Sequence, residues 1–524
     1  MPIGTLVKKN EYHDSVSLMR LSSELNQLEG VQESAAIMAT DVNKELLVEP
    51  GLLTPEAQEA RANDLVVVVE AESQESMDEA LDRVGQLLAR TEGQTEQAEQ
   101  ALPRTLTEAL QQSQQANLVL ISTPGPYAAT EAYRALQEGL HVFMFSDNVS
   151  VEDEIMLKQL ARQRGLLMMG PDSGTAIING HPLGFANLAR RGRIGIVAAS
   201  GTGTQEVSSL IHRLGEGVSQ AIGVGSRDLS EAVGGTMMSM GLEALVNHRQ
   251  TQVIVLISKP PAPNIAHRLL EQVQKIPKPV VVNFLGGDLR EINKNGAVPA
   301  FTLEDAAAQA VSMARGQEAE PVFFSQAVEQ INAIVERETA GMKEQQQWVR
   351  GLFSGGTFTS EAQLLLRDMV GKIYSNVPLQ PELKLEPHHP SRENTLLDLG
   401  SDEYTVGRPH PMIDFRTRVE AIKREAEDPG TAVILLDVVL GFGAHEDPAG
   451  ELVPAIRLAK ESAQKDGRSL AVVASICGTD QDIQNRDEQV KHLAESGVII
   501  MESNAQAARL SGLIATRELI AEQT

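Results

Sequence analysis

The chain has 524 residues, with 45 Lys and Arg against 71 Asp and Glu, giving a formal net charge of −26. This length exceeds what one hydrophobic core supports, so several domains are expected. The acidity argues against a nucleic-acid surface, because phosphate backbones are bound by clustered cations. No segment approaches the roughly 20 apolar residues of a membrane helix, and the first residues lack the apolar stretch of a signal peptide, so we expect a cytoplasmic protein without membrane contact.

Runs of Val, Ile and Leu recur along the chain, each followed by Gly, Ser or Pro and then by a helical pattern. Such runs are typical of strands buried on both faces, and their alternation with helices indicates parallel sheets. The predicted fold class is therefore multidomain α/β. The segments with this pattern are 64–73, 116–140, 141–148, 195–203, 252–263, 279–287, 350–357, 432–443 and 470–480.

Composition shifts divide the chain into five expected parts. They are a small N-terminal α/β domain (1–110) for which an ACT-like or partner-docking role is a hypothesis, α/β units at 111–190 and 191–320, a helical linker at 321–347, and a further α/β unit at 348–524.

The loop at 200–204, Ser-Gly-Thr-Gly-Thr, follows a strand run and opens a helix. Its glycines let a ligand approach the backbone, and the helix N-terminus presents free N–H groups to an anion. The candidate phosphate-binding residues are Ser200, Gly201, Thr202, Gly203 and Thr204. A plain capping box formed by Thr202 and Gln205 is the alternative interpretation.

Similar strand–glycine–helix junctions recur at 222–235, 352–362 and 438–450. In open α/β sheets these loops gather at the carboxyl ends of the strands, where ligands bind. Two helix ends facing one site would stabilise a phosphoryl or acyl phosphate group without a metal. The further phosphate-binding candidates are Gly225, Gly355, Gly356, Thr357, Gly441 and Gly443.

Nucleotide-binding motifs are absent from the sequence. The loop at 122–132 follows a strand run but lacks G-x-G-x-x-G, with Pro126 where that turn needs glycine. No Walker A sequence is present either, so neither an NAD site nor an intrinsic ATP site is expected. His, Cys and carboxylates are not clustered at ligand spacing, which predicts no protein-held metal. Cys477, the only cysteine, excludes an internal disulfide and is interpreted as a buried small apolar residue.

Several polar side chains near these loops suit chemistry on an acyl phosphate. Glu206 is a candidate base, Arg227 a candidate phosphate clamp, and His410 and His445 are candidate acid–base groups. Lys259 follows a predicted strand and could reach the same cleft, and Arg408 lies with His410 in a loop flanked by prolines. Each of these side chains has a structural alternative, such as a solvated surface position. Asp172 and Ser173, which end the unit at 111–190, are further candidates, and a tight turn is their structural alternative.

These segments together resemble the alpha subunit of succinyl-CoA synthetase. The similarity lies in 121–140, 165–180, 192–207 and 223–228, and the fourth unit resembles the C-terminal ligase domain of the beta subunit through 436–448. The resemblance implies a Rossmann-like CoA-binding domain at 111–190 and two flavodoxin-like CoA-ligase domains. The candidate substrate- or CoA-binding residues are Ser122, Thr123, Pro124, Ser146, Asn148, Asp172, Ser173, Lys259 and Arg408.

A more specific pattern is that of the FdrA family, including its YahF-type members. It is carried by DSVSLM (14–19), NKELL (43–47), FSDNVSVEDE (145–154), MMGPDSGTA (168–176), SKPPAP (258–263), GGT (355–357) and VGRPHPMID (406–414). The resemblance implies an acyl-CoA-synthetase-like protein that acts with partner proteins in carbamoyl transfer between oxalurate and carbamoyl phosphate.

Two departures from the synthetase pattern bear on the chemistry. The phosphorylated histidine expected after 278–287 is absent, since the chain continues DLREINKNGAVPAF, and no ATP-grasp domain precedes the fourth unit. The leading hypothesis is therefore a carbamoyl or acyl phosphate transferase component that takes phosphate or carbamoyl phosphate and a small acid or amide acceptor such as oxamate. A CoA-dependent ligase and a non-catalytic scaffold are the alternatives. Partner subunits and homo-oligomerisation are expected, and CoA is a possible cofactor.

Overall fold

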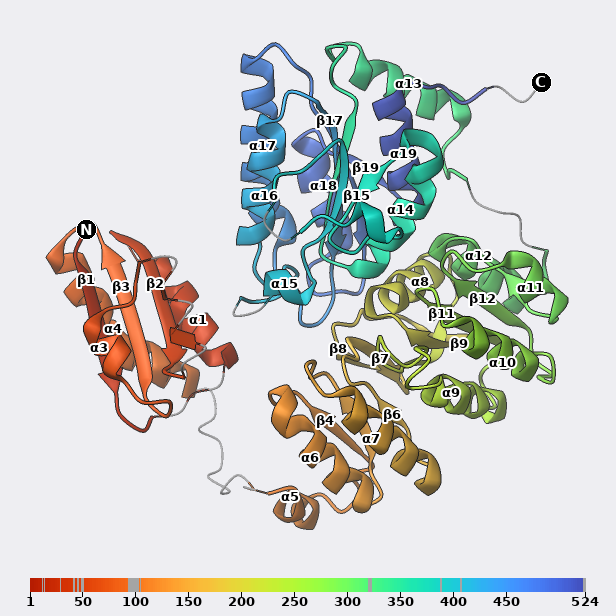
Figure 1. Cartoon of the computed structure of the whole chain (residues 1–524), viewed down its shortest axis with the longest axis horizontal. Helices are drawn as coiled ribbons and strands as arrows, with labels where there is room; N and C mark the ends of the chain where they lie inside the picture. The colour runs from red at the N-terminus through yellow and green to blue at the C-terminus, as the bar shows by residue number, and fades with distance from the viewer. Residues whose placement is uncertain are drawn as a thin grey trace. The chain divides into compact units, whose positions relative to one another are not determined.

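The computed structural model describes residues 1–11, 13, 15–28, 30–40, 43–44, 47–48, 51–92, 103, 105–318, 323–386, 389–405 and 408–521. The chain forms two compact units, Met1–Ala109 and Leu110–Thr524, and both are mixed α/β (Figure 1). No helix in the described part is both long and apolar enough to span a lipid bilayer.

The first unit is a three-stranded antiparallel sheet in the order β1-β3-β2. Its elements are β1 (Ile3–Lys8), α1 (Ser15–Asn26), β2 (Val31–Met38), α3 (Pro55–Glu59), β3 (Leu65–Ala71), α4 (Gln74–Glu92) and, at its end, α5 (Leu106–Gln112). The valine run is β3, and Leu65–Val69 are fully buried between α1 and α4 on one face and the segment around Leu52 on the other. Burial of β3 on both faces is as expected, but its pairing is antiparallel. The reason is that α1 connects β1 to β2, and β3 lies between these two strands and runs opposite to both.

The second unit begins with a parallel sheet in the order β4-β5-β6, with α6 and α7 packed against it. The bounds are β4 (Leu118–Ile121), α6 (Gly125–Gln137), β5 (His141–Met144), α7 (Val151–Arg164) and β6 (Met168–Met169).

A seven-stranded sheet follows, in the order β13-β12-β11-β9-β10-β7-β8. Its pairs are parallel except β10–β7 and β7–β8, which are antiparallel. The sheet takes strands from both sides of residue 190. The bounds are β7 (Thr175–Ile178), β8 (His181–Gly184), β9 (Arg191–Ala199), α8 (Gly201–Arg213), β10 (Val218–Gly223), α9 (Thr236–Asn247), β11 (Val253–Ser258), α10 (Pro263–Val273), β12 (Val280–Phe284), α11 (Leu289–Lys294), β13 (Val298–Pro299) and α12 (Leu303–Ala314).

The last sheet is fully parallel, in the order β15-β16-β14-β17-β18-β19. The bounds are α13 (Val328–Thr339), β14 (Trp348–Phe353), α14 (Gly356–Val370), β15 (Ile373–Tyr374), a 3₁₀ turn (Pro381–Leu383), β16 (Asn394–Asp398), α15 (Asp402–Thr405), α16 (Arg416–Glu427), β17 (Thr431–Val439), α17 (Pro448–Lys465), β18 (Ala471–Cys477), α18 (Arg486–Glu495), β19 (Ile499–Met501) and α19 (Asn504–Thr516).

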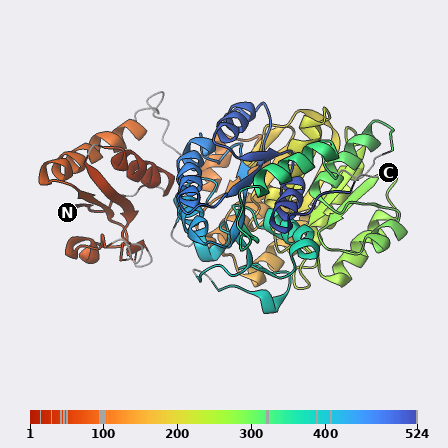
Figure 2. The ribbon, with the colours of Figure 1, turned by 90° about the horizontal axis from the view of Figure 1, so that it is seen from above.

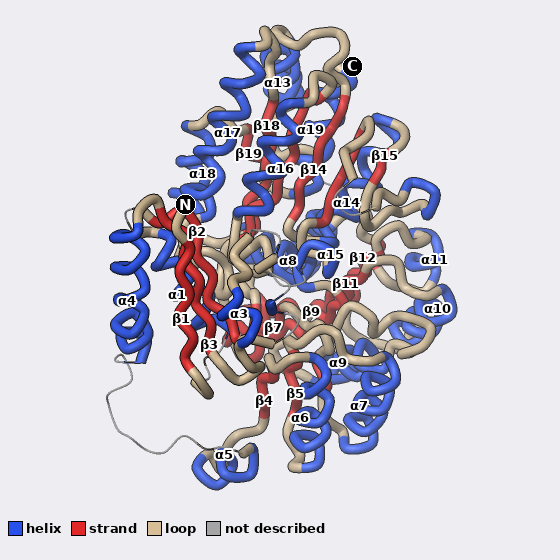
Figure 3. Tube along the Cα trace, turned by 60° about the vertical axis from the view of Figure 1, so that its left-hand side comes forward, coloured by secondary structure: helices blue, strands red, loops and turns tan. Residues whose placement is uncertain are grey.

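Four helices join the two large sheets. α8 and α12 pack on one another, as do α14 and α19, and α8 also contacts α14. Figure 2 shows helices on both sides of the strands in this unit, and Figure 3 shows α8 where the two sheets approach. One continuous hydrophobic core contains side chains of both sheets and of these four helices. The two sheets are therefore held together by apolar packing.

Each large sheet reverses its strand order at its first parallel strand. From β9 the chain continues to β10 on one side and then to β11 on the other, and from β14 it continues to β15 and β16 and then to β17. Such switch points are where open α/β sheets bind ligands. The helices that leave them are α8 and α14, so the sequence loops at 200–204 and 355–357 both lie at a switch point.

Candidate functional site

Strand register places Lys259 beside the first glycine-rich loop. Ser258, the last residue of β11, pairs with Ala199, the last residue of β9. The next residues of the two strands are therefore neighbours at the carboxyl edge of the sheet, and these are Lys259 and Ser200.

The last sheet repeats this arrangement with a carboxylate. Asp398, at the end of β16, pairs with Phe353, at the end of β14. The side chain of Asp398 is 5% exposed and lies next to the loop that opens α14.

The N-termini of α8 and α14 meet at these two edges. Ser200 Oγ and Thr357 Oγ1 form a buried hydrogen bond of 2.6 Å. A Cβ on Gly355 would lie 2.5 Å from Cγ2 of Thr202, so only glycine permits this approach. We call this place the helix junction: Ser200–Thr204, Gly355–Thr357, Lys259 and Asp398.

The cap of α8 differs from the sequence expectation. Ser200 is the N-cap, its hydroxyl accepts from Gly203 N at 2.9 Å, and the helix begins at Gly201. Thr202 is thus inside the first turn and not the start of a capping box. A serine hydroxyl competes effectively for the first-turn amides, and this places the helix start two residues earlier.

The N-terminus of α14 has no side-chain cap within the described residues. Beside it, a Cβ built on Gly356 would lie 2.5 Å from Asp398 Oδ2 and 2.7 Å from Lys259 Nζ. No hydrogen bond or ion pair to another described residue engages this ammonium group. An uncapped helix N-terminus next to a lysine is suited to an anion.

Two carboxyl groups near the helix junction have pKa values raised above the ordinary aspartate value. Burial raises the pKa of Asp398 to about 6, although the charge of Lys259 acts in the opposite sense. Surrounding protein also raises the pKa of Asp172 to about 6, while a hydrogen bond from Ser226 and the charge of Lys259 oppose this rise. Asp172 is open to solvent, so it can exchange protons with water.

The two helices share a six-residue pattern, Gly-Thr-x-Thr-x-Glu, at 201–206 and 356–361. In each, the second threonine donates to the carbonyl four residues earlier: Thr204 to Ser200 at 2.6 Å, and Thr359 to Gly355 at 3.1 Å. This correspondence is a short repeat that can be read from the sequence alone.

The glutamates of this pattern turn away from the helix junction. Glu206, fully buried, accepts from Asn504 N at the start of α19, and Glu361 accepts from Leu303 N at the start of α12. Burial raises the pKa of Glu206. Each glutamate thus accepts from the N-terminus of a helix that packs on the other large sheet. Glu206 therefore lies in the contact between the two sheets and does not point to the helix junction.

Arg227 is engaged elsewhere. Its guanidinium lies 3.0 Å from Glu154 Oε2 and donates to the Val149 carbonyl at 2.8 Å. Gly225 and Ser173 lie where the loop after β10 contacts the loop after β6. A Cβ on Gly225 would clash with the Pro171 carbonyl oxygen, and Ser173 donates to the Gly223 carbonyl. The structure does not bring these three residues to the helix junction.

The loops that follow β4 and β5 are in direct contact with each other. Ser146 donates to the Thr123 carbonyl at 2.5 Å, and a Cβ on Gly125 would lie 2.4 Å from the carbonyl oxygen of Asn148. Ser122, Thr123 and Pro124 are exposed. The N-terminus of α6 therefore faces backbone carbonyls.

The two histidines occupy different surroundings. His410 packs on Phe185 with 5.4 Å between ring centroids and borders Gly400, and burial lowers its pKa to about 4, so its imidazole is neutral at pH 7. His445 packs edge-on against Phe415. Gly441 and Gly443 pack against Ala186 and Phe185, respectively, and the exposed Arg408 lies near His410 in the chain.

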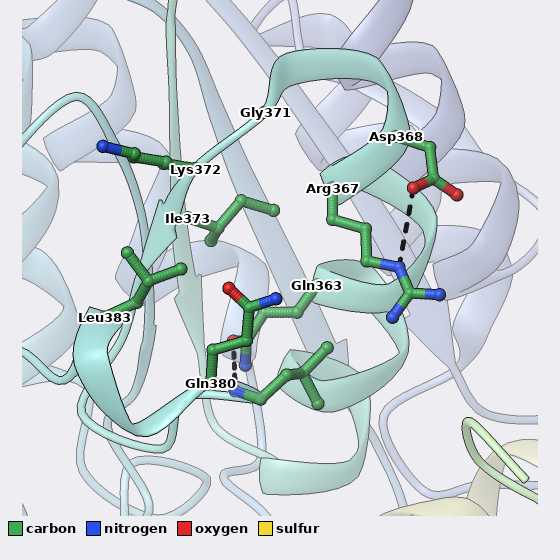
Figure 4. Close-up of a pocket in the computed structure, with 9 residues that line it drawn as sticks. Gln363, Arg367, Asp368, Gly371, Lys372, Ile373, Gln380 and Leu383 are labelled. Carbon is green, nitrogen blue, oxygen red and sulfur yellow. Dashed lines mark hydrogen bonds and ion pairs between the residues drawn. The ribbon is translucent and has the colours of Figure 1, made fainter.

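An open recess lies at the other end of α14 (Figure 4). Gln363, Arg367 and Gly371 line it, and Arg367 lies 3.6 Å from Asp368 in an ion pair. It is separate from the helix junction, which lies at Gly356 at the first residue of the same helix. Cys477 is buried as expected, and burial raises its thiol pKa.

Sequence reasoning missed Asp398. The signal is a carboxylate directly at the end of an apolar run, Thr-Leu-Leu-Asp-Leu-Gly. Its significance depends on the pairing of β16 with β14, which the sequence pattern alone does not specify.

Three family models match parts of the chain. One for a CoA-ligase matches residues 352–514, one for a CoA binding domain matches 189–286, and one described as AllF, heavy metal-associated domain matches 1–104. The first two cover the switch points that carry α14 and α8.

The first unit does not fit a thiolate-bound heavy metal. The only cysteine of the chain is Cys477, outside that unit. Among the described residues, no group of three His, Cys, Asp or Glu side chains is placed to hold a metal ion.

Similar proteins include the uncharacterized protein YahF of Escherichia coli strain K12, which is 44% identical over 98% of this chain and 98% of its own length. The alpha subunit of the ADP-forming succinate–CoA ligase of Aquifex aeolicus is 30% identical over 30% of this chain and 51% of its own. A solved ATP citrate lyase of Methanothrix soehngenii, in complex with citrate and coenzyme A, is 14% identical over 79% of this chain and 83% of its own, with a TM-score of 0.34. The identity to YahF along almost the whole of both chains shows that this chain belongs to the FdrA/YahF family of acyl-CoA-synthetase-like proteins.

Proposed function

We propose that this chain is a component of a carbamoyl transferase that moves a carbamoyl group between phosphate and a small acceptor such as oxamate. The phosphate of carbamoyl phosphate would bind at the helix junction. The observation that supports this most directly is the meeting of two helix N-termini, joined by Ser200 and Thr357, beside the ammonium group of Lys259.

Charge stabilisation is what such a site supplies. Carbamoyl phosphate already contains an activated C–O–P linkage, so transfer needs a bound phosphate and an oriented acceptor and no covalent intermediate on the protein. Helix-end amides and a lysine stabilise the charge that develops on the leaving phosphate. Partner subunits and assembly of several copies are part of this proposal.

A CoA ligase activity is the second candidate, and the two CoA-related family matches favour it. The close contact of Gly125 with the Asn148 carbonyl argues against a pyrophosphate at the N-terminus of α6, because this carbonyl occupies the space beside the helix end. A scaffold without activity is a third. Its glycine-rich loops would be blocked by their own side chains, as Gly203 N is by Ser200, whereas α14 lacks such a cap.

The test is a thermal-shift series on the purified chain with phosphate, carbamoyl phosphate, CoA and ATP, each with and without oxamate. We expect carbamoyl phosphate to raise Tm, since a ligand at about 100 times its Kd stabilises by about 2.7 kcal/mol. In Gly356→Ala the shift should be lost, because the added Cβ pushes on Asp398 and Lys259. These contacts are the ends of flexible side chains, so the variant should fold.

Gly85→Ala is the matched control. Gly85 is exposed within α4, and a Cβ there meets nothing within 4 Å, so the response to carbamoyl phosphate should be unchanged. Stabilisation by CoA alone would replace the proposal with the ligase, and no response to any of the four compounds would favour the scaffold.

A further inference from the structure

Asp398 presents an unpaired carboxylate oxygen to the helix junction. Its Oδ1 accepts from Gly400 N at 3.0 Å, and its backbone is held by Asn376 through two hydrogen bonds of 2.9 Å. Oδ2 has no hydrogen bond or ion pair with any residue that the structure describes, although the side chain is 95% buried. The oxygen borders the Cα of Gly356 and the ammonium group of Lys259, and is therefore placed to receive an N–H group from a ligand.

Lys259 faces the same place with the opposite charge. The Cβ position of Gly356 lies within 2.7 Å of its Nζ and within 2.5 Å of Asp398 Oδ2. An ammonium group has three donors and no acceptor, so its natural ligand is a carboxylate or a phosphate. Lysine and aspartate thus present complementary groups to one small volume.

We propose that Lys259 and Asp398 bind the acceptor of the transfer, a small molecule with a carboxylate and an N–H group a few atoms apart, and that Asp398 receives the proton from its nitrogen. This inference rests on the proposed function, because the acceptor must lie next to the phosphate at the two helix ends. Lys259 would bind the carboxylate of the acceptor, and Asp398 Oδ2 its N–H group.

The step balances without a further reactant. The acceptor nitrogen attacks the carbamoyl carbon, a C–N bond forms, and the C–O bond to phosphate breaks with its electron pair on the phosphate oxygen. The proton leaves the nitrogen for Asp398 Oδ2 and passes to the released phosphate. The reverse reaction, from phosphate and the carbamoylated acceptor, follows the same path.

The surroundings of Asp398 suit proton transfer near neutral pH. Lys259 favours its ionised form, while burial, Asp437 and Asp172 favour the protonated form, so its pKa is about 6. Asp147 and Asp402 act in the same direction on Asp172. A general base is most effective when its pKa lies near the working pH.

The test is calorimetric titration of the full chain with oxamate, with inorganic phosphate present. Asp398→Asn keeps the shape and the acceptor for Gly400 N but replaces Oδ2 by an N–H₂ group. We expect oxamate affinity to fall about tenfold or more, since a hydrogen bond to a charged group is lost, while phosphate affinity stays within about twofold. Oxalate, without N–H, and acetamide, without a carboxylate, should both bind the wild-type chain more weakly than oxamate does.

Asp368→Asn is the control, because this side chain is 83% exposed and its ion pair is with the neighbouring Arg367; its oxamate and phosphate affinities should match the wild type. Oxamate affinity of the wild type should also fall as the pH drops below about 6, whereas oxalate affinity should not. Unchanged oxamate affinity in Asp398→Asn, or equal pH profiles for oxamate and oxalate, would overturn the acceptor site. Failure of phosphate and carbamoyl phosphate to bind the wild type would instead refute the proposed function, and this is measured in separate titrations.

Discussion

The buried ammonium group of Lys158 holds the loop that follows β10 in place. Its Nζ contacts Glu154 Oε1 at 2.7 Å, Asp228 Oδ1 at 2.8 Å and the Val224 carbonyl at 2.9 Å. The three charged side chains are at most 1% exposed. Asp228 also accepts from Met238 N in the first turn of α9. This network fixes the loop after β10 against α7.

Replacing this lysine should be strongly destabilising. Lys158→Met removes the cation that Glu154 and Asp228 share, and only Glu154 keeps a second one, Arg227. Breaking a buried ion pair typically costs about 3–5 kcal/mol. We expect a loss of this size in urea unfolding. Lys491→Met, at a lysine that is 71% exposed, should stay within about 0.5 kcal/mol of the wild type. Equal stabilities of the two variants would refute the structural role of Lys158.

At single positions, the sequence predicts side-chain chemistry better than side-chain neighbours. Ser200, Thr202, Gly355, Thr357 and Lys259 were identified because each follows or opens an element, and the structure brings them together. Arg227 shows the limit: its place in a glycine-rich loop suggested an anion, but Glu154, 73 positions earlier in the chain, is its partner. Such choices are decided by tertiary contacts that local patterns do not encode.

Buried carboxyl groups connect the N-termini of α12 and α19, which belong to different large sheets. Glu361 accepts from Leu303 N at 2.7 Å and from Asn504 Nδ2 at 2.8 Å, and Glu304 accepts from Ser503 Oγ at 2.9 Å. Burial raises the pKa of Glu304 and of Glu361 to about 7, with Glu206 acting in the same direction and Arg509 in the opposite one.

These raised pKa values make the interface sensitive to pH. A carboxyl group whose pKa is higher in the folded state than its ordinary value of 4.5 stabilises the fold fully below pH 4.5, and this contribution is lost as the pH rises through about 7. The free energy of unfolding should therefore fall across this window, by up to about 1.4 kcal/mol per pH unit for each proton.

Glu361→Gln should reduce this pH slope, because the amide oxygen still accepts from Leu303 N but does not titrate. The measurement is urea unfolding at a series of pH values from about 4.5 to 8, compared with Glu495→Gln at an exposed position. A slope in Glu361→Gln equal to that of the wild type would show that this carboxyl does not titrate in the window.

Among the elements, the parallel strands were the most predictable. Every segment chosen for its Val, Ile and Leu run contains a strand, because burial on both faces requires continuous apolar residues. Orientation was less predictable: β3 has the same kind of run but pairs antiparallel with both neighbours. The short strands β7 and β8 have too few residues to show a pattern, so their place in the seven-stranded sheet came only from the structure.

Both helix N-termini of the junction belong to the same chain, and Leu110–Thr524 form one compact unit. All the residues of the proposed phosphate site are therefore present in each copy. Calorimetry should give one phosphate per chain, with a Kd that does not change on dilution, whatever assembly the chain forms. A stoichiometry of one phosphate per two chains, or weaker binding on dilution, would mean that the site is completed by a neighbouring copy.

Glu206 and Glu361 each accept a hydrogen bond from the first backbone amide of a helix that packs on the other large sheet. Loss of either glutamate leaves an amide without its acceptor across the interface, and not beside the altered residue. A tolerated change on one side therefore requires a matching change on the other. The two halves are constrained to evolve together, as two interacting proteins are, although a single polypeptide encodes both.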